Sequence, residues 1–343
     1  MPTTALVICD DSNMARKQLL RALPPEWEVS VTMANNGLEG LQAVRNGLAE
    51  VMLLDLTMPV MDGYQTLAAM RAEGLEPKVI VVSGDVQDEA VRRVMELGAL
   101  AFLKKPAEPV ELQATLQRLG LIAEARPQPA PTQAPAAPVA RQVPAGAEGN
   151  ISFNDAMRET VNVAMGRAAA LLAKVLGVFV QLPVPNVNML EVGELHMALA
   201  DADRGQRLTA VCQGYIGGGI AGEALLLLHD SETADIARLM KGDSPDYSDM
   251  EMLLDLSTLA IGACLSGIGE QIDVPFSLGH PQILGQQSGI SDLIDVNQKR
   301  WKKTLAVEVS YSVEGHNIHF DLLMLFTEDS VERLSRKLAY MMS

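Results

Sequence analysis

The first third of the chain places three carboxylates directly after apolar segments. Asp10 and Asp11 follow the run Ala5–Cys9, and Asp55 follows Val51–Leu54. If these runs are neighbouring strands, the like charges converge and repel one another unless a cation neutralises them. Carboxylate oxygens are hard ligands that suit Mg²⁺, which keeps several waters and can bridge to a phosphoryl oxygen. We therefore expect these three side chains to bind a magnesium ion.

Two more polar side chains follow apolar segments. Ser83 comes after Val79–Val82. Lys105 is the second of the two lysines that follow Ala101–Leu103. A serine hydroxyl can donate a hydrogen bond to a phosphoryl group, and a lysine can pair with its charge. Any one of these residues alone could cap a strand or begin a loop. Their joint occurrence at four segment ends favours a site in which Asp55 accepts a phosphoryl group.

The segments between the apolar runs have helical patterns, for example at Met14–Leu23 and Glu89–Leu97. Apolar strands that alternate with helices predict an α/β fold, with a doubly wound parallel sheet covered on both faces. In such sheets the working residues gather at the carboxyl ends of the strands. The predicted fold therefore brings the five polar side chains to one edge.

Residues 5–120 resemble the CheY-like receiver domain of response regulators. The resemblance rests on Asp10-Asp11, on LLDLTMPVMDG around Asp55, on VVSG at Ser83, and on Lys105-Pro106. It implies a five-stranded sheet, Mg²⁺ as cofactor, and phosphorylation of Asp55 by a histidine kinase. It also implies a cis peptide bond before Pro106, and it marks Phe102 as an aromatic that changes rotamer on activation.

Composition divides the chain into three parts. Residues 123–150 carry six prolines among alanines and polar residues. Such a segment lacks the apolar groups to form a core and is typical of a semi-extended linker. We therefore predict a first domain at 1–122 and a second domain at 151–343.

Charge and hydropathy exclude several classes of protein. The formal net charge of −16 argues against a nucleic-acid partner, because phosphate backbones need clustered Lys and Arg. No uninterrupted apolar run approaches the roughly 20 residues that a bilayer requires, and the N-terminus lacks a signal-peptide pattern. Cys9, Cys212 and Cys264 sit in apolar stretches without metal-type spacing, which is typical of buried free thiols. We expect a cytoplasmic protein without membrane insertion.

The second domain contains an internal repeat displaced by 96 residues. Each copy opens with a serine and an acid three residues later, which predicts a capping box at a helix start. These pairs are Ser152/Asp155 and Ser248/Glu251. A glycine and a proline recur at the same displacement, Gly166 with Gly262 and Pro185 with Pro281. We infer a duplicated unit with pseudo-two-fold symmetry.

Each repeated helix carries polar groups at i, i+4 and i+7, which share one face. The two sets are Asp155, Glu159 and Asn162, then Glu251, Asp255 and Thr258. An amide such as that of Asn162 accepts and donates hydrogen bonds at once, so it can hold a water in line for attack on phosphorus. Glu159 could pair with a lysine on a phosphorylated partner. The alternative for a single copy is the ordinary polarity of an amphipathic helix.

The remaining segments predict β-hairpins. Arg207–Leu228 surrounds a glycine cluster, and Thr304–Val313 is joined to Ile318–Phe326 by EGHN. We expect a second α/β domain in which two long pseudo-symmetric helices pack on an antiparallel sheet.

The spacing Asp155-x3-Glu159-x2-Asn162-x22-Pro185, together with GGIAGEALLLL, resembles the CheC/CheX/FliY phosphatases, which dephosphorylate the chemotaxis regulator CheY. The resemblance covers most of 151–343. It implies that Asn162 orients the hydrolytic water and that Glu159 contacts the receiver lysine.

The second copy departs from this pattern. Asp255 replaces the glutamate and Thr258 replaces the asparagine. Aspartate is one methylene shorter, and threonine lacks the amide's paired donor and acceptor. We therefore expect a single working site on the first helix, with the second helix a degenerate copy that serves as a structural relic or a docking surface.

Two functions stay open. The first is a phosphatase acting on the aspartyl phosphate of a CheY-like protein, or on the chain's own receiver in cis, with Asp55 phosphorylation altering access. The second is a non-catalytic adaptor or phosphate sink that binds CheD-like or other chemotaxis and flagellar proteins. The Glu159/Asn162 pair favours the enzyme, and the altered second copy favours the adaptor.

Overall fold

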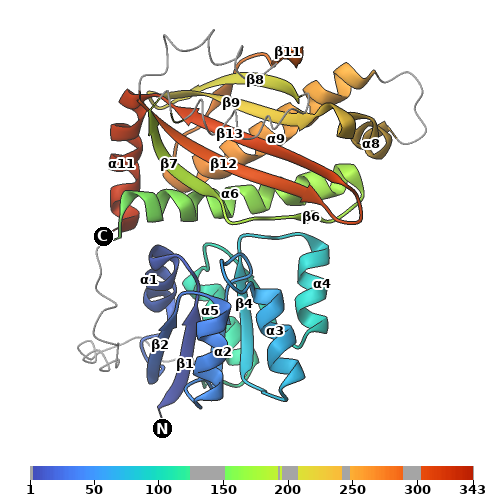
Figure 1. Ribbon diagram of the computed structural model, residues 1–343. Coiled ribbons are helices and arrows are strands. Elements are labelled where there is room, and N and C mark those ends of the chain that lie inside the picture. Colours follow the sequence, from blue (N-terminus) through green and yellow to red (C-terminus); the bar gives the residue numbers. More distant parts are fainter. Residues whose placement is uncertain are drawn as a thin grey trace. The chain divides into compact units, whose positions relative to one another are not determined.

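The computed structural model describes residues 3–123, 151–191, 194, 208–241, 248–288 and 303–342 (Figure 1). These residues form two compact units, one with the elements from β1 to α5 and one with those from α6 to α11. Apart from Ala123, the predicted linker 123–150 lies outside the described residues.

The first unit is a doubly wound α/β sheet, as predicted. Its strands are parallel and lie in the order β2-β1-β3-β4-β5. The elements are β1 (Thr4–Cys9), α1 (Asn13–Ala22), β2 (Val29–Ala34), α2 (Gly37–Arg45), β3 (Val51–Leu54), α3 (Gly63–Ala72), β4 (Lys78–Ser83), α4 (Asp88–Glu96), β5 (Ala101–Lys104) and α5 (Pro109–Arg118). Strand β2 was not among the apolar runs, because its sequence VSVTMA mixes hydroxyl and apolar residues.

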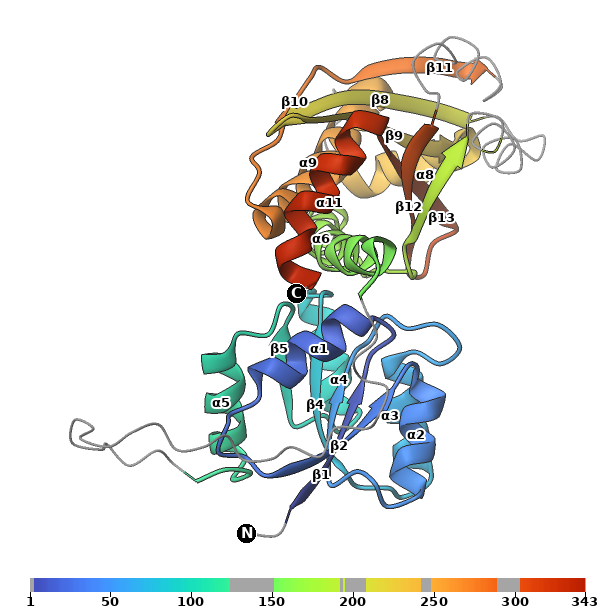
Figure 2. The same cartoon turned by 90° about the vertical axis from the view of Figure 1, so that its left-hand side faces the viewer.

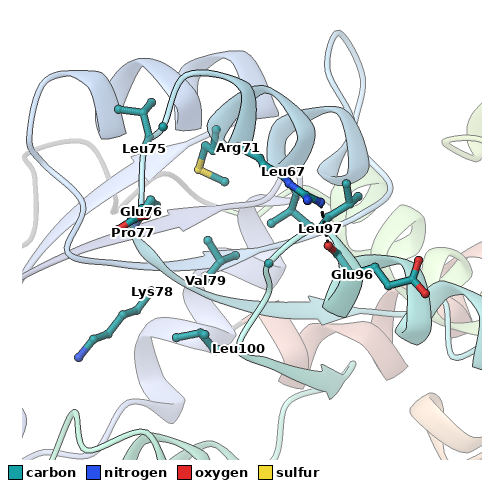
Figure 3. Close-up of a pocket in the computed structure, with 13 residues that line it drawn as sticks. Leu67, Arg71, Leu75, Glu76, Pro77, Lys78, Val79, Glu96, Leu97 and Leu100 are labelled. Atoms are coloured by element: carbon teal, nitrogen blue, oxygen red, sulfur yellow. Dashed lines mark hydrogen bonds between the residues drawn. The ribbon is translucent and has the colours of Figure 1, made fainter.

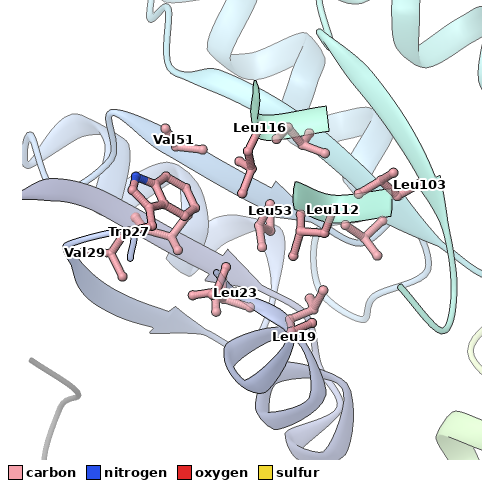
Figure 4. Packing of buried hydrophobic residues seen from close by; sticks show 14 of the residues in the cluster. Leu19, Leu23, Trp27, Val29, Val51, Leu53, Leu103, Leu112 and Leu116 are labelled. Atoms are coloured by element: carbon pink, nitrogen blue, oxygen red, sulfur yellow. The ribbon is translucent and has the colours of Figure 1, made fainter. Parts of the chain in front are cut away.

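Two hydrophobic clusters cover the two faces of this sheet. On one face, Leu19 of α1 and Leu112 and Leu116 of α5 pack towards Leu53 and Leu103 of the strands (Figure 4). On the other face, side chains of α2, α3 and α4 pack on the alternate strand residues, namely Leu41, Val44, Leu67, Met70 and Val94 on Cys9, Met52, Leu54, Val79 and Val81. Strands buried on both faces explain why the runs are continuously apolar.

The residues at the start of helix α3 determine how closely this helix packs against the end of β3, where Asp55 lies. Helix α3 starts at a capping box in which the Asp62 carboxylate accepts from the backbone N–H of Gln65 at 2.7 Å. Gly63 follows, and a Cβ on it would lie 2.4 Å from the carbonyl oxygen of Asp55. Only glycine allows the start of this helix to pack so closely against the strand end.

The second unit is a single antiparallel sheet with helices. The sheet order is β10-β8-β9-β13-β12-β6, while β11 pairs with β8 and β7 pairs with β12. The elements are α6 (Phe153–Leu176), β6 (Val180–Gln181), β7 (Asn186–Glu191), β8 (Leu208–Gly217), β9 (Ile220–His229), α8 (Asp230–Lys241), α9 (Asp249–Ile272), β10 (Ser277–Leu278), β11 (Gln282–Ser288), β12 (Lys303–Val313), β13 (Ile318–Phe326) and α11 (Glu328–Met342). The long helices α6 and α9 lie together against the sheet (Figure 2), which confirms the predicted arrangement.

The inferred duplication extends through the whole second unit. Helices α6 and α9 both have 24 residues and begin 96 positions apart, after Ser152 and Ser248. Both end in a left-handed residue, Gly177 and Asp273. The strand pairs repeat as well: β7 joins β12 as β11 joins β8, and the two copies meet at the central pair β9–β13.

The two predicted hairpins are present. Strands β8 and β9 are joined through Gly218 and Gly219, whose φ angles of 57° and 78° suit a tight two-residue turn. Strands β12 and β13 pair from Leu305↔Phe326 to Val313↔Ile318.

The predicted capping box is confirmed for the second helix, and the predicted serine cap is confirmed for the first. At α9, the Glu251 carboxylate accepts from the backbone N–H of Ser248 at 3.0 Å while the serine oxygen accepts from Glu251 N–H. At α6, the Ser152 oxygen accepts from the N–H of Asp155 at 3.1 Å.

Helices α6 and α9 cross closely in antiparallel directions. A Cβ on Gly267 would lie 2.8 Å from the Cα of Ala164. One turn away along both helices, the Gln271 side chain of α9 donates to the carbonyl of Thr160 in α6 at 2.8 Å. Helix α9 is, by length and composition, the one helix among the described residues that could cross a membrane, but 61% of its apolar window is buried inside the unit.

This crossing predicts unequal effects of two glycine substitutions in α9. We expect Gly267→Ala to lower the free energy of unfolding of the second unit by about 1–3 kcal/mol, because the new methyl overpacks against Ala164. Gly262→Ala is the matched control, since its Cβ would meet nothing nearer than Leu278 at 3.4 Å. It should leave stability unchanged or raise it by up to about 1 kcal/mol through helix propensity. Thermal and urea unfolding of both variants measure this, and equal effects would contradict the described crossing.

Candidate functional site

The three predicted carboxylates lie together at the carboxyl edge of the first sheet. Strands β1 and β3 pair in register with Cys9 opposite Leu54, so Asp10 and Asp55 emerge side by side. One oxygen from each of Asp10, Asp11 and Asp55 lies within 4.8 Å of the others. Asp10 and Asp55 are each 1% exposed.

Lys105 provides the positive charge at this cluster. Its ammonium nitrogen lies 2.7 Å from Asp10 Oδ2 and 3.3 Å from Asp55 Oδ2. The backbone N–H of Lys105 donates to the carbonyl of Ser83 at 2.8 Å, which holds the ends of β4 and β5 together. The Lys105–Pro106 peptide bond is cis, as the receiver resemblance implied. Ser83 is fully buried at the end of β4.

A second buried cation at this edge was missed from the sequence. The Arg16 guanidinium donates to the carbonyl of Asp10 and to the side chain of Asn13. Arg16 is 6% exposed and lies beside Met14 and Ala15 on the buried side of α1. An arginine within an otherwise apolar helical stripe is the signal that could have identified it.

The environment of Cys9 excludes thiolate chemistry beside the carboxylates. Burial raises the pKa of the Cys9 thiol far above its ordinary value, and the charges of Asp10 and Asp55 raise it further. The thiol therefore stays protonated, and it donates to the carbonyl of Asn36 at 3.2 Å.

The carboxylate cluster fits a magnesium ion. Mg²⁺ binds one or two carboxylates and keeps several waters. Three carboxylate oxygens already gathered at a strand edge, one of them on the partly exposed Asp11, satisfy this requirement.

The polar faces of the two long helices differ in exposure. Asp155, Glu159 and Asn162 on α6 are each less than a tenth exposed, whereas the α9 counterparts Glu251, Asp255 and Thr258 are exposed. The Thr258 hydroxyl donates to its own helix, at the carbonyl of Leu254, over 2.8 Å. The second face therefore lacks a side-chain amide, and its hydroxyl hydrogen is already engaged.

One pocket of the first unit lies away from these residues. It has a volume of about 470 Å³ and lies at the amino end of β4, where Lys78 and Val79 line it (Figure 3). Arg71 borders it and donates to the carbonyl of Glu96 at 3.1 Å. Because Ser83 and the carboxylates stand at the opposite end of the parallel strands, this pocket does not belong to the candidate site.

Comparisons with known proteins identify the first unit. Residues 6–117 match the family model described as "Response regulator receiver domain". The chain is 36% identical to a protein-glutamate methylesterase/protein-glutamine glutaminase of Myxococcus xanthus, over 41% of this chain and 44% of the relative. It is 31% identical to a probable C4-dicarboxylate response regulator of Priestia megaterium, over 34% of this chain and 50% of the relative. The chain thus spans about half the length of these relatives or less.

Two solved structures, of a FliY protein and of a CheX–CheY complex, are among the similar structures. FliY of Thermotoga maritima covers 55% of this chain and 96% of its own, with 20% identity and a TM-score of 0.44. A chain of the CheX–CheY complex from Borrelia burgdorferi covers 35% of this chain and 90% of its own, with 24% identity and a TM-score of 0.33. Both scores are low, so the function of the second unit is argued below from its own residues.

The carboxylate cluster predicts metal binding that depends on Asp11. We expect Asp11→Asn to weaken Mg²⁺ affinity at least about tenfold, because loss of even an outer partner of a metal ligand costs that much. Asp88→Asn, at an exposed position of α4, is the control and should leave the affinity unchanged. Calorimetric titration of the full chain measures both. Equal Mg²⁺ affinity for Asp11→Asn and wild type would remove Asp11 from the site.

Proposed function

We propose that this chain is a phosphorylatable two-component protein whose second unit hydrolyses the aspartyl phosphate of a CheY-like receiver. The observation that carries the proposal is the asymmetry of the duplicated unit. Two helices of the same length and the same position in the fold differ at the two positions that chemistry would need, Glu159 and Asn162 against Asp255 and Thr258.

The proposed acceptor is Asp55 in the first unit. Its carboxylate attacks the phosphorus of a phosphohistidine on a histidine kinase, and the histidine nitrogen leaves as the new P–O bond forms. Asp10, Asp11 and Asp55 would hold Mg²⁺, which when bound neutralises charge on the phosphoryl oxygens. Lys105 pairs with the phosphoryl charge, and the Ser83 hydroxyl donates a hydrogen bond to it.

The proposed hydrolysis uses the face of α6. The amide oxygen of Asn162 accepts a hydrogen bond from a water, and this fixes the water in line with the bond between phosphorus and the aspartyl oxygen. Attack of the water forms inorganic phosphate, breaks that bond and returns the carboxylate of the partner receiver. Glu159 pairs with the partner's lysine that corresponds to Lys105. Positioning of this kind supplies most of the catalysis in phosphoryl transfer.

The substrate class follows from these roles. A CheY-like receiver brings its own carboxylates and lysine, so the second unit needs to supply only the amide and the carboxylate. The substrate is a separate receiver in trans, or Asp55 of the same chain in cis, and phosphorylation of Asp55 changes access to the α6 face. CheD-like or other chemotaxis proteins are further proposed partners.

Hydrolysis should depend on Asn162. Full chain carrying Asp55→Ala, which removes the competing acceptor, is mixed with a CheY-like receiver phosphorylated by a small phosphodonor. We expect Asn162→Ala to slow the loss of aspartyl phosphate about a hundredfold, because the water loses its alignment. Thr258→Ala, the counterpart on α9, should leave the rate unchanged.

The same assay separates enzyme from adaptor and cis from trans. If the chain with intact Asn162 gives no acceleration over spontaneous decay, the phosphatase proposal fails and binding without hydrolysis remains. Action in cis is tested with the Asp55-containing chain, in which Asn162→Ala should prolong the lifetime of its own phosphate. If the Asn162→Ala chain and the chain with intact Asn162 have the same phosphate lifetime, self-hydrolysis is excluded, and a lifetime that shortens as protein concentration rises indicates action in trans.

A further inference from the structure

Helix α9 is bonded to the backbone of α6 through the side-chain amide of Gln271. The amide nitrogen donates to the carbonyl of Thr160 at 2.8 Å, and to the carbonyl of Gly267 in its own helix at 3.0 Å. An amide nitrogen carries two hydrogens, so it can make both bonds at once. Thr160 is fully buried, so the bond reaches α6 on a side that is closed to solvent.

This bond and the close approach of the two helices lie on either side of Asn162 in the sequence. Thr160 precedes Asn162 by two residues, and Ala164, which meets Gly267, follows it by two. Glu159 directly precedes Thr160. Helix α9 therefore holds α6 at two points around the proposed phosphatase pair. A turn held in this way cannot rotate or slide without breaking one of the two contacts.

Helix α11 fixes the end of α9 from which Gln271 extends. The Tyr340 hydroxyl donates to the backbone carbonyl of Gln271, and the Lys337 ammonium donates to that of Asp273 at 3.3 Å. The last carbonyls of a helix have no partner within the helix, so these bonds from α11 satisfy two of them. Gln271 is the last residue but one of α9, where helix ends fray. Its amide thus starts from a backbone position that α11 holds in place.

The duplication does not repeat this bond. The displacement of 96 residues relates Gln271 to Val175 and Thr160 to Leu256. A valine side chain has no hydrogen-bond donor, so Val175 cannot hold α9 as Gln271 holds α6. Val175 is also 43% exposed. The helix that carries Asn162 is therefore held from a position whose counterpart cannot hold the other helix.

We propose that Gln271 is a positioning residue of the phosphatase, which keeps the Asn162 amide in the orientation that aligns the water. This inference rests on the proposed function, because it names the residue that supports the α6 face. Alignment of the water with phosphorus is steeply sensitive to displacement. The attraction between Glu159 and a lysine of the receiver falls off slowly with distance. Loss of the Gln271 bond therefore lowers kcat and leaves KM nearly unchanged.

Three substitutions of Gln271 separate the donor from the size of the side chain. The assay uses the full chain with Asp55→Ala and a CheY-like receiver phosphorylated by a small phosphodonor. Gln271→Met keeps the length and helix propensity but removes the donor, and we expect kcat about tenfold lower with KM within about twofold. Gln271→Asn, whose amide is one methylene too short to reach Thr160, should have the same effect. Gln271→Lys keeps a donor of sufficient length and should recover most of the lost rate.

Glu270→Gln is the matched control in the same interface. It removes the ion pair of Glu270 with Arg167, which also joins α9 to α6. Exposed pairs of this kind contribute little to stability. The bond from Gln271 to Thr160 is left intact, so kcat should be unchanged.

A binding measurement distinguishes positioning from partial unfolding. The receiver is loaded with beryllofluoride, a stable mimic of the aspartyl phosphate, and is titrated calorimetrically into the chain with Gln271→Met. Positioning predicts unchanged stoichiometry and affinity despite the lower kcat. A stoichiometry that falls in step with kcat would overturn the inference, because it would show a smaller fraction of folded protein.

Two kinetic results would also overturn the inference while leaving the proposed function in place. One is a kcat for Gln271→Met within about twofold of the parent chain, when Asn162→Ala is still slow. The other is an equal kcat for Gln271→Lys and Gln271→Met. Failure of the proposed function appears separately, as hydrolysis that does not depend on Asn162, and it removes the role of Gln271 as well.

Discussion

Mutual repulsion of three carboxylates is the constraint around which the first unit is built. Parallel pairing of β1 with β3 brings Asp10 beside Asp55, and the Lys105 ammonium forms ion pairs with both carboxylates. The backbone N–H of the lysine donates in turn to the carbonyl of Ser83, at the end of the neighbouring strand β4. A site held in this way is sensitive to any change of charge, and that is the property a phosphorylation switch uses.

The second unit meets a different constraint, which is that two copies share one core. Helices α6 and α9 approach so closely at Ala164 and Gly267 that neither can change its course alone. The polar faces point away from this crossing, so its packing does not restrict which side chains they carry. The backbone of both copies has therefore stayed alike while the side chains on the faces have diverged, from amide to hydroxyl at the position of Asn162 and Thr258.

Most of the architecture could be predicted from the sequence, because apolar runs and helical spacing report burial directly. The carboxylate cluster could be predicted because each member follows a buried strand. Strand β2 and the buried Arg16 were missed, since hydroxyl residues blur the apolar pattern and a guanidinium in a helix is usually exposed. The hydrogen bond from Thr258 to Leu254 depends on a rotamer, which spacing does not specify.

The central pairing of β9 with β13 has a consequence for how the duplicated unit can be divided. The two repeats are joined by backbone bonds from Phe320↔Leu228 to Phe326↔Gly222, in the middle of the sheet. Removing the second repeat would take away β12, the partner of β7, and β11, a partner of β8. It would also leave β9, with its consecutive leucines Leu225–Leu228, as an unpaired edge, which invites association with another chain. The second repeat thus closes the sheet edge of the first through backbone bonds, which do not depend on the side chains of its polar face.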